Sequence, residues 1–232
     1  LTQADGNNDW RITGVDRGTL TDITSGFGNI QRLTGGSGDD DFIFTLNGSL
    51  AGLISGGTAT TIDSVNMSAL ANVSVTLEQD ITGIEEITGN GANSTLIATD
   101  ADNMWNISGE NDGSVTGIAF IDFANLTGGS GIDVFDVDTV GKITGLVKGG
   151  ANNDVANIAL TGAETGSFSF DGEDDQDTIN LTGGATFYDG QYNSNVGVYE
   201  QLEYTNGSNV YAVNYTQTET VNDNLTSAKL TI

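Results

Sequence analysis

Three residue types that support much of protein chemistry are missing from this sequence: its 232 residues include no cysteine, no histidine and no proline. Without cysteine there is no disulfide framework and no thiol chemistry. Without histidine, the roles of general base and nucleophile would fall to carboxylates. No apolar run approaches the roughly 18 to 20 residues that a membrane helix needs, so we expect no membrane insertion.

Positive charge is also scarce, with six basic residues against 32 carboxylates and a formal net charge of -26. A field of that sign repels phosphate backbones and anionic lipid, and it attracts divalent cations. We therefore expect no nucleic-acid partner, and calcium is the candidate cofactor. The chain starts at Leu1 without the charged and apolar segments of a signal peptide, so we expect it to be a piece of a longer protein.

Glycine is abundant, with 33 residues, and much of it lies in an internal duplication. Matched blocks recur in the same order, spaced by 91 to 95 residues. The block Asn8 to Gly14 returns as Asn103 to Gly109, Leu33 to Phe42 as Leu126 to Phe135, Gly52 to Gly57 as Gly145 to Gly150, and Asp63 to Met67 as Asp154 to Ile158 and again as Asp177 to Leu181. Chance does not produce four matched blocks in register.

The spacing of glycine turns predicts the fold. Neighbouring turns at Gly36 and Gly57, and at Gly129, Gly150 and Gly172, are about 21 residues apart, which is the length of one coil of a parallel β-solenoid. Short apolar or alternating runs lie between the turns, and helical signals are nearly absent. We predict an all-β fold, a parallel β-helix or β-roll solenoid, with one repeat unit of about four coils over 1–97 and a second over 98–185.

The last part of the chain differs, because all six tyrosines lie in it. Residues 199–205, the turn residues Asn206 and Gly207, and residues 210–216 predict a hairpin with Tyr211, Val213 and Tyr215 on one face. We expect 186–232 to form a tyrosine-rich C-terminal cap or antiparallel appendage. The tyrosines could alternatively bind glycans or a neighbouring subunit.

Two blocks point to calcium. Residues 35–42 and 128–135 both fit the pattern Gly-Gly-x-Gly-x-Asp-x-apolar, in which glycines permit a tight turn and carbonyl and carboxylate oxygens offer hard ligands. Asp40 and Asp133 are the leading candidates. Weaker copies and neighbouring carboxylates complete the candidate ligand set: Asp39, Asp41, Asp154, Asp175 and Asp177. The alternative is that these are glycine turns whose aspartates cap backbone amides.

With these blocks the sequence resembles the repeats-in-toxin class of calcium-binding β-roll proteins, and more broadly the long β-strand-repeat proteins of bacterial surfaces. The resemblance covers most of residues 3–185. It implies secretion by a bacterium, an extracellular or cell-surface location, and a structural or adhesive role. The sequence departs from that class in one respect: its complete motifs are solitary and 93 residues apart, whereas the class stacks them in tandem.

Two further residue sets carry open alternatives. Asn66, Asn157 and Asn180 occupy equivalent places, which predicts either an internal ladder of side-chain amides or outward polar residues on strands. Trp10 and Trp105 could form a sugar-binding platform, but their fixed place in the repeat favours core packing.

The leading hypothesis is a structural or adhesive segment of a secreted bacterial repeat protein, with a glycan or cell-surface ligand as a candidate partner. A second is a self-associating filament subunit joined by an exposed tail strand over 225–232. The third is a β-helical polysaccharide lyase or hydrolase. The duplication disfavours an enzyme, because an active site is a unique place and a repeat distributes its residues evenly, so we predict no catalysis.

Overall fold

The computed structural model describes residues 1–3, 6–21, 23–57, 62–183, 186–187, 189–196, 199–227 and 230–231. These residues form β-strands that belong mainly to one large, mostly parallel sheet, and none of them lies in a helix, so none forms a helix that could cross a membrane. The all-β prediction is confirmed. The chain forms two compact units, Leu1–Ile97 with Gly117–Phe123 and Ala98–Thr116 with Ala124–Ile232.

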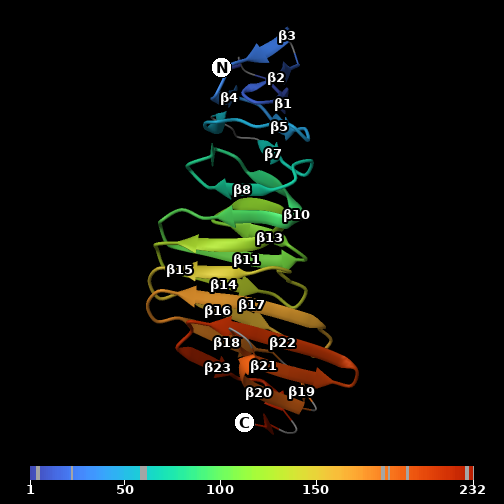
Figure 1. Cartoon of the computed structure of the whole chain (residues 1–232), viewed down its shortest axis with the longest axis vertical. Helices are drawn as coiled ribbons and strands as arrows, with labels where there is room; N and C mark the ends of the chain where they lie inside the picture. The colour runs from blue at the N-terminus through green and yellow to red at the C-terminus, as the bar shows by residue number, and fades with distance from the viewer. Residues whose placement is uncertain are drawn as a thin grey trace. The chain divides into compact units, whose positions relative to one another are not determined.

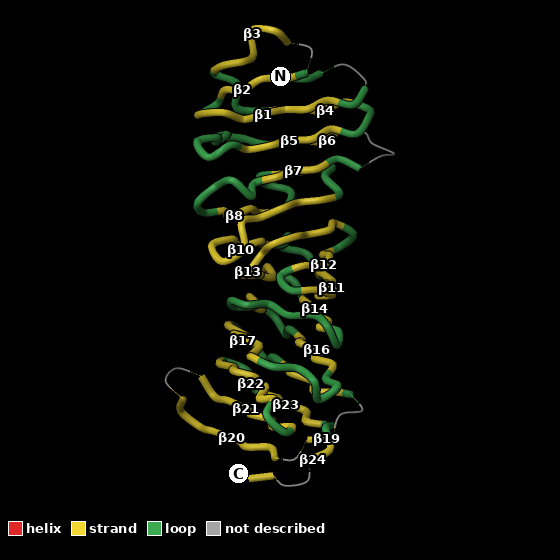
Figure 2. Tube along the Cα trace, turned by 90° about the vertical axis from the view of Figure 1, so that its right-hand side faces the viewer, coloured by secondary structure: helices red, strands yellow, loops and turns green. Residues whose placement is uncertain are grey.

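The first unit holds ten strands and the beginning of β13: β1 (Asn8–Gly14), β2 (Arg17–Leu20), β3 (Ile23–Gly28), β4 (Leu33–Gly36), β5 (Asp40–Phe44), β6 (Ile54–Gly57), β7 (Ser64–Asn66), β8 (Val73–Thr76), β9 (Ile81–Thr82), β10 (Glu86–Ile97) and β13 (Ile118–Gly129). Strands β1, β5 and β7 pair in parallel, and so do β4, β6 and β9. Figure 2 shows β4 level with β1 and β6 level with β5. Strand β2 pairs antiparallel with β1, and β3 pairs antiparallel with β2.

The second unit repeats this arrangement with the end of β13 and fourteen further strands: β11 (Asn103–Gly109), β12 (Asp112–Val115), β14 (Asp133–Val137), β15 (Val147–Gly150), β16 (Val155–Ala159), β17 (Gly166–Glu173), β18 (Thr178–Thr182), β19 (Thr186–Phe187), β20 (Asp189–Val196), β21 (Tyr199–Asn206), β22 (Asn209–Thr216), β23 (Thr220–Asp223), β24 (Thr226–Ser227) and β25 (Leu230–Thr231). Strands β11, β14, β16, β18 and β23 pair in parallel in that order (Figure 1). Strands β13, β15, β17 and β22 form the other parallel series.

The parallel register follows the glycine spacing. Phe135 pairs with Ala156 and Ala156 with Ile179, so successive partners in the sheet are separated along the chain by about the interval between neighbouring glycine turns. The next step in this series, from Ile179 to Val221, is about twice as long because the hairpin strands lie between them.

Alternation along the strands builds the core. Strand β5 buries Asp40, Phe42 and Phe44 and turns the residues between them toward solvent, as expected of a strand with a side-chain period of two. The prediction that both tryptophans are core residues is confirmed, because Trp10 and Trp105 are fully buried. Each stacks on a phenylalanine of the next strand, Phe42 or Phe135, with ring centroids 5.4 Å apart and planes inclined by 18°.

The predicted hairpin is present in the second unit. Strands β21 and β22 pair antiparallel through the turn between Asn206 and Asn209. Tyr211, Val213 and Tyr215 share the buried face, as predicted, and β22 also pairs in parallel with β17. The hairpin is thus continuous with the sheet of the second unit. Of the other tyrosines, Tyr204 is buried, Tyr188 lies outside the described residues, and the side chains of Tyr192 and Tyr199 are not described.

The C-terminal tail is paired within its own chain. Strand β24 pairs in parallel with β19, and β25 pairs in parallel with β20. The described tail strands β24 and β25 are therefore already hydrogen-bonded to strands of the second unit.

Candidate functional site

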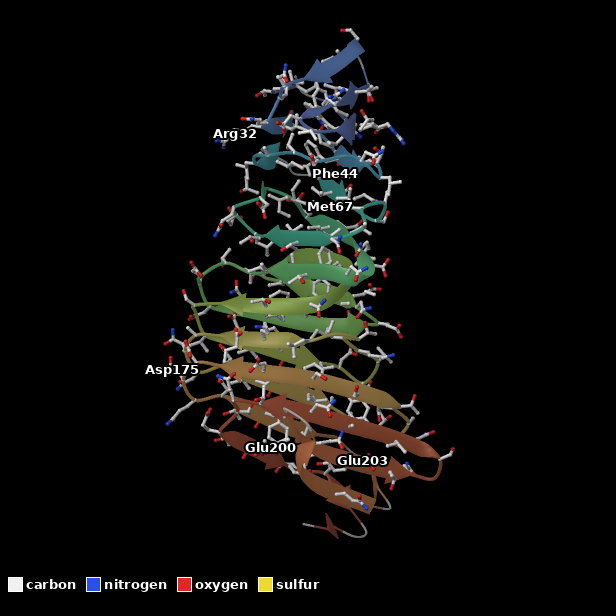
Figure 3. The ribbon with its side chains drawn as sticks, in the orientation of Figure 1. Arg32, Phe44, Met67, Asp175, Glu200 and Glu203 are labelled. Atoms are coloured by element: carbon white, nitrogen blue, oxygen red, sulfur yellow. The ribbon has the colours of Figure 1, made fainter. Side chains whose placement is uncertain are left out.

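The aspartates predicted as calcium ligands fall into two groups. Asp40, Asp133, Asp154 and Asp177 are fully buried, whereas Asp39, Asp41 and Asp175 lie at the surface. Figure 3 shows Asp175 on a turn at the outside of the second unit. The strands explain the difference, since each buried aspartate is two residues before a buried apolar side chain and so faces the core with it.

In the first unit the buried carboxyls form a hydrogen-bonded column. The amide of Asp40 donates to Oδ1 of Asp63 at 2.8 Å, and the amide of Asp63 donates to Oε2 of Glu85 at 2.8 Å. At the other end, Nδ2 of Asn8 donates to Oδ1 of Asp40 at 2.7 Å. Each acidic side chain therefore caps the backbone of the preceding level.

The second unit contains the same column with one more member. The amide of Asp133 donates to Oδ1 of Asp154 at 2.7 Å, and that of Asp154 to Oδ1 of Asp177 at 2.8 Å. The amide of Asp177 donates to Oε2 of Glu219 at 2.8 Å, so this column too ends on a glutamate. Asn103 lies at the other end of this column, where its backbone amide and its Nδ2 both donate hydrogen bonds to Oδ1 of Asp133, at 3.1 and 2.7 Å.

The glycines of the motif make room for these carboxyls. A Cβ placed on Gly149 would lie 2.4 Å from Oδ2 of Asp154, and a Cβ on Gly128 would lie 2.3 Å from Oδ2 of Asp133. Contacts this short do not occur for real side chains, so only glycine fits. The motif therefore encodes a close approach between an inward carboxyl and the glycine backbone five residues earlier.

Most of the Oδ2 atoms of the buried aspartates lack the hydrogen bonds that would offset their loss of contact with water. Within the described part of the chain, Oδ2 of Asp40, Asp63, Asp154 and Asp177 is buried without a hydrogen-bond partner. Asp133 is the exception, because its Oδ2 accepts from the amide of Gly129 at 2.8 Å. A buried ionised carboxyl with an unpaired oxygen is costly, which favours the protonated form.

The pKa values follow from that cost. Desolvation by burial, reinforced by neighbouring carboxylates, raises the pKa of Asp154 to about 7 and the pKa of Asp63 and Asp177 to about 6. Desolvation also raises the pKa of Asp40 and Asp133 above the ordinary value, while hydrogen bonds from Asn8 and Asn103 oppose the rise. These carboxyls therefore bind protons at a higher pH than an ordinary aspartate does.

The side chains of the three exposed candidates also accept hydrogen bonds from other segments of the chain. Oδ1 of Asp39 accepts from the amide of Ile62 at 3.1 Å, and Oδ1 of Asp41 accepts from the hydroxyl of Ser64. Oδ2 of Asp175 accepts from the amide of Asn152 at 3.2 Å.

The geometry agrees with amide capping for the candidate ligands, the alternative raised by the sequence. Among the residues that the structure describes, no three acidic side chains come together as a metal-binding group. Calcium stays a prediction for these carboxylates.

The sequence did not single out several members of the columns, namely Asn8, Asp63, Glu85, Asn103 and Glu219. Asp63 was detectable, because it opens a repeated block and precedes Val65 and Met67 at the inward spacing. The two glutamates have no comparable signal, since each reaches its partner from outside the repeated block.

A second ladder, of amides, runs along the second unit. Nδ2 of Asn222 donates to Oδ1 of Asn180, Nδ2 of Asn180 to Oδ1 of Asn157, and Nδ2 of Asn157 to Oδ1 of Asp136, at 2.8, 2.8 and 2.7 Å. The side chains are half-buried or exposed, so the ladder is present but lies outside the core. Asn66 takes no part in it and instead accepts from the amide and hydroxyl of Ser68.

Comparison of the chain with protein-family models, with curated proteins and with solved structures finds no match.

Proposed function

We propose that this chain is a structural, non-catalytic segment of a secreted bacterial repeat protein, in which each repeat is a stretch of parallel β-solenoid. The observation that carries the proposal is the pair of aspartate columns. Both units use equivalent buried residues, Asp40 with Asp63 and Asp133 with Asp154, to fasten the backbone of one level to the next. A residue set that is repeated and buried serves architecture rather than a single reaction.

The solenoid assignment is supported by the register. Parallel partners separated by one interval between glycine turns, with alternate side chains buried, are what a coiled chain produces when each coil stacks on the previous one. The extracellular assignment is supported by the resemblance of the glycine and aspartate blocks to secreted repeat proteins and by the strongly acidic composition.

The first unit has a cavity lined by Phe44, Met67 and Ile81 among other residues, and its carboxylates bear on the rival hypothesis of a glycoside hydrolase. One carboxylate, Asp80, is among the thirteen residues that line it. Glycosidic hydrolysis ordinarily uses two carboxyl groups on opposite sides of the bond, which this cavity does not provide.

Calcium enters the proposal as a ligand of exposed turn carboxylates. Oδ1 of each buried aspartate accepts a hydrogen bond, and the unpaired Oδ2 atoms of Asp40, Asp63, Asp154 and Asp177 are shielded from solvent. The proposed cation therefore binds the surface oxygens of Asp39, Asp41 or Asp175. Such a site would have the weak affinity of extracellular calcium modules, with a Kd on the order of 0.1 to 1 mM.

Single-molecule pulling tests the structural role. The chain is inserted between two reference domains and stretched from its ends. A solenoid should give way in steps of about 75 Å, the extended length of one coil at up to about 3.6 Å per residue. We expect Asp154→Ala, which removes one cap, to lower the force of at least one step, and Asp100→Ala, at an exposed position, to leave the forces unchanged. A single step of the full length, or no resistance above that of an unfolded chain, would reject the proposal.

Two parallel assays separate the rival functions. Incubation with a panel of acidic and neutral polysaccharides should release no new reducing ends or unsaturated products. Beads coated with the chain should not bind glycans or cells more than beads coated with an unrelated acidic protein. Depolymerisation would establish an enzyme, and saturable bead binding would establish an adhesin.

A further inference from the structure

The two repeats differ at one place in their cores. In the second unit β17 runs without interruption over eight residues and buries Phe168 and Phe170, with Phe170 paired to Val147. In the first unit the equivalent strand is β9, reduced to two residues, in which Ile81 pairs with Ile54. A turn over residues 78–80 replaces the segment that would carry the first of the two aromatic side chains.

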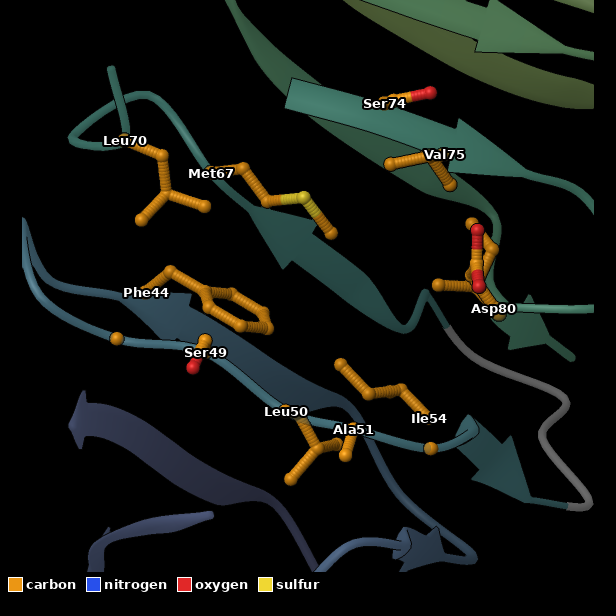
Figure 4. A pocket seen from close by; sticks show the side chains of 13 residues that line it. Phe44, Ser49, Leu50, Ala51, Ile54, Met67, Leu70, Ser74, Val75 and Asp80 are labelled. Atoms are coloured by element: carbon orange, nitrogen blue, oxygen red, sulfur yellow. The ribbon is translucent and has the colours of Figure 1, made fainter. Parts of the chain in front are cut away.

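A cavity occupies this place in the first unit. It has a volume of about 210 Å³ and opens to solvent, and Figure 4 shows Phe44, Met67, Leu70 and Val75 around it. Ile54 and Ile81 complete its apolar wall. The volume exceeds the roughly 150 Å³ that suffices for an apolar cavity to take up benzene.

The rim of the cavity is acidic. Asp80 is exposed beside it, and its Oδ2 is held by the amide of Thr76 at 2.8 Å. This bond fixes the carboxylate at the edge of the apolar wall (Figure 4). None of the five basic residues that the structure describes lines the cavity, and the net charge of -26 draws cations toward it.

We propose that this cavity is a binding site for one aromatic ring that carries a positively charged amine. The ring would take the place that the register assigns to Phe168 in the second unit, in contact with Phe44 and the thioether of Met67, which packs favourably on aromatic rings. The amine would lie at the rim beside Asp80. The site belongs to the first repeat, because in the second repeat the longer strand β17 carries Phe168 at the equivalent position.

Methionine methyl NMR tests the proposal on the intact chain. The sequence has two methionines, Met67 in the cavity wall and Met104 on β11 of the second unit, 56% exposed, which serves as an internal control. Chains labelled with ¹³C at the methionine methyls are titrated with benzylamine, toluene and benzoate. We expect benzylamine to shift the Met67 signal saturably, with a Kd on the order of 1 mM, and to leave Met104 in place.

Two variants separate the parts of the site. Asp80→Asn keeps an oxygen for the Thr76 amide but removes the charge, and should weaken benzylamine binding about fivefold while leaving toluene unchanged. Ala51→Phe, at an exposed lining residue, should fill the cavity and abolish both responses. Equal affinity for benzylamine, toluene and benzoate, no effect of Asp80→Asn, or shifts of Met67 and Met104 that grow together without saturation would each overturn the assignment. These outcomes do not depend on the folding of Ala51→Phe.

Discussion

At the scale of single residues, the fold depends on pairs made of one glycine and one buried aspartate. One carboxyl oxygen lies close to the glycine backbone five residues earlier, and the other caps an amide of the preceding level, as Asp154 does toward Gly149 and Asp133. Glycine is required because a Cβ would collide with the carboxyl, and aspartate is required because its carboxyl accepts a hydrogen bond from the backbone amide. This explains why the two residue types recur together in the sequence.

A Cβ at Gly149 tests this coupling. The added atom would lie 2.4 Å from Oδ2 of Asp154 and 2.7 Å from the carbonyl oxygen of Gly172. Because backbone cannot yield cheaply, we expect Gly149→Ala to lower the free energy of unfolding by about 2 to 4 kcal/mol. Urea unfolding monitored by tryptophan fluorescence measures it. The matched control is Gly28→Ala, where a Cβ meets nothing within 4 Å, and an equal loss in both variants would contradict the coupling.

The buried aspartates also predict how stability depends on pH. Burial raises the pKa of Asp154 to about 7 in the folded chain, so the folded state keeps protons that the unfolded chain releases near pH 4. Stability should therefore be greatest at low pH and decline as pH rises through 6 and 7, by up to about 1.4 kcal/mol per pH unit for each titrating group. Urea unfolding at pH 5 and pH 8, at constant ionic strength, should show the lower midpoint at pH 8.

Substitution separates this effect from the general repulsion of an acidic chain. Asp154→Asn removes the group whose pKa is raised by burial and by the neighbouring carboxylates Asp133 and Asp177, and it should reduce the difference between pH 5 and pH 8. Asp100→Asn removes an equal charge from an exposed position and should reduce it little. The linkage argument fails if the two variants have the same pH profile.

At the scale of strands, the sequence predicted the all-β class, the hairpin over residues 199–216 and the interval of about 21 residues, which separates successive parallel partners. The sequence analysis did not predict that the motif aspartates are buried, and β5 shows why. The motif was recognised as a ligand pattern, but the alternation of Asp40 with Phe42 and Phe44 already places that carboxyl on the apolar face. Spacing alone cannot reveal that Glu85 closes the column, because this contact forms only when distant levels stack. The cavity likewise follows from a strand that is shorter than its repeat, which no motif encodes.

The amide ladder is a property of four strands together, β14, β16, β18 and β23. Asn180 occupies its middle and makes one bond to each side, so Asn180→Ala should lower the free energy of unfolding by about 1 to 2 kcal/mol. Urea unfolding is again the measurement. Thr182→Ala, at an exposed position two residues along the same strand, is the matched control and should cost less. If both substitutions cost the same, the ladder does not stabilise the unit.

At the scale of the whole molecule, the dominant property is a net charge of -26 on 232 residues, and it makes the response to calcium informative. A cation bound only by the folded chain stabilises it by RT ln(1 + [L]/Kd), which for a Kd of about 1 mM and 10 mM calcium is about 1.4 kcal/mol. For a chain of this size we expect Tm to rise by about 2 to 4 °C. Thermal melting with calcium, with magnesium at the same concentration and with a chelator measures the shift. Calcium should exceed magnesium if the exposed oxygens of Asp39, Asp41 or Asp175 coordinate the ion. Equal shifts would mean that divalent charge acts by screening alone, and the aspartates would then serve only to cap amides.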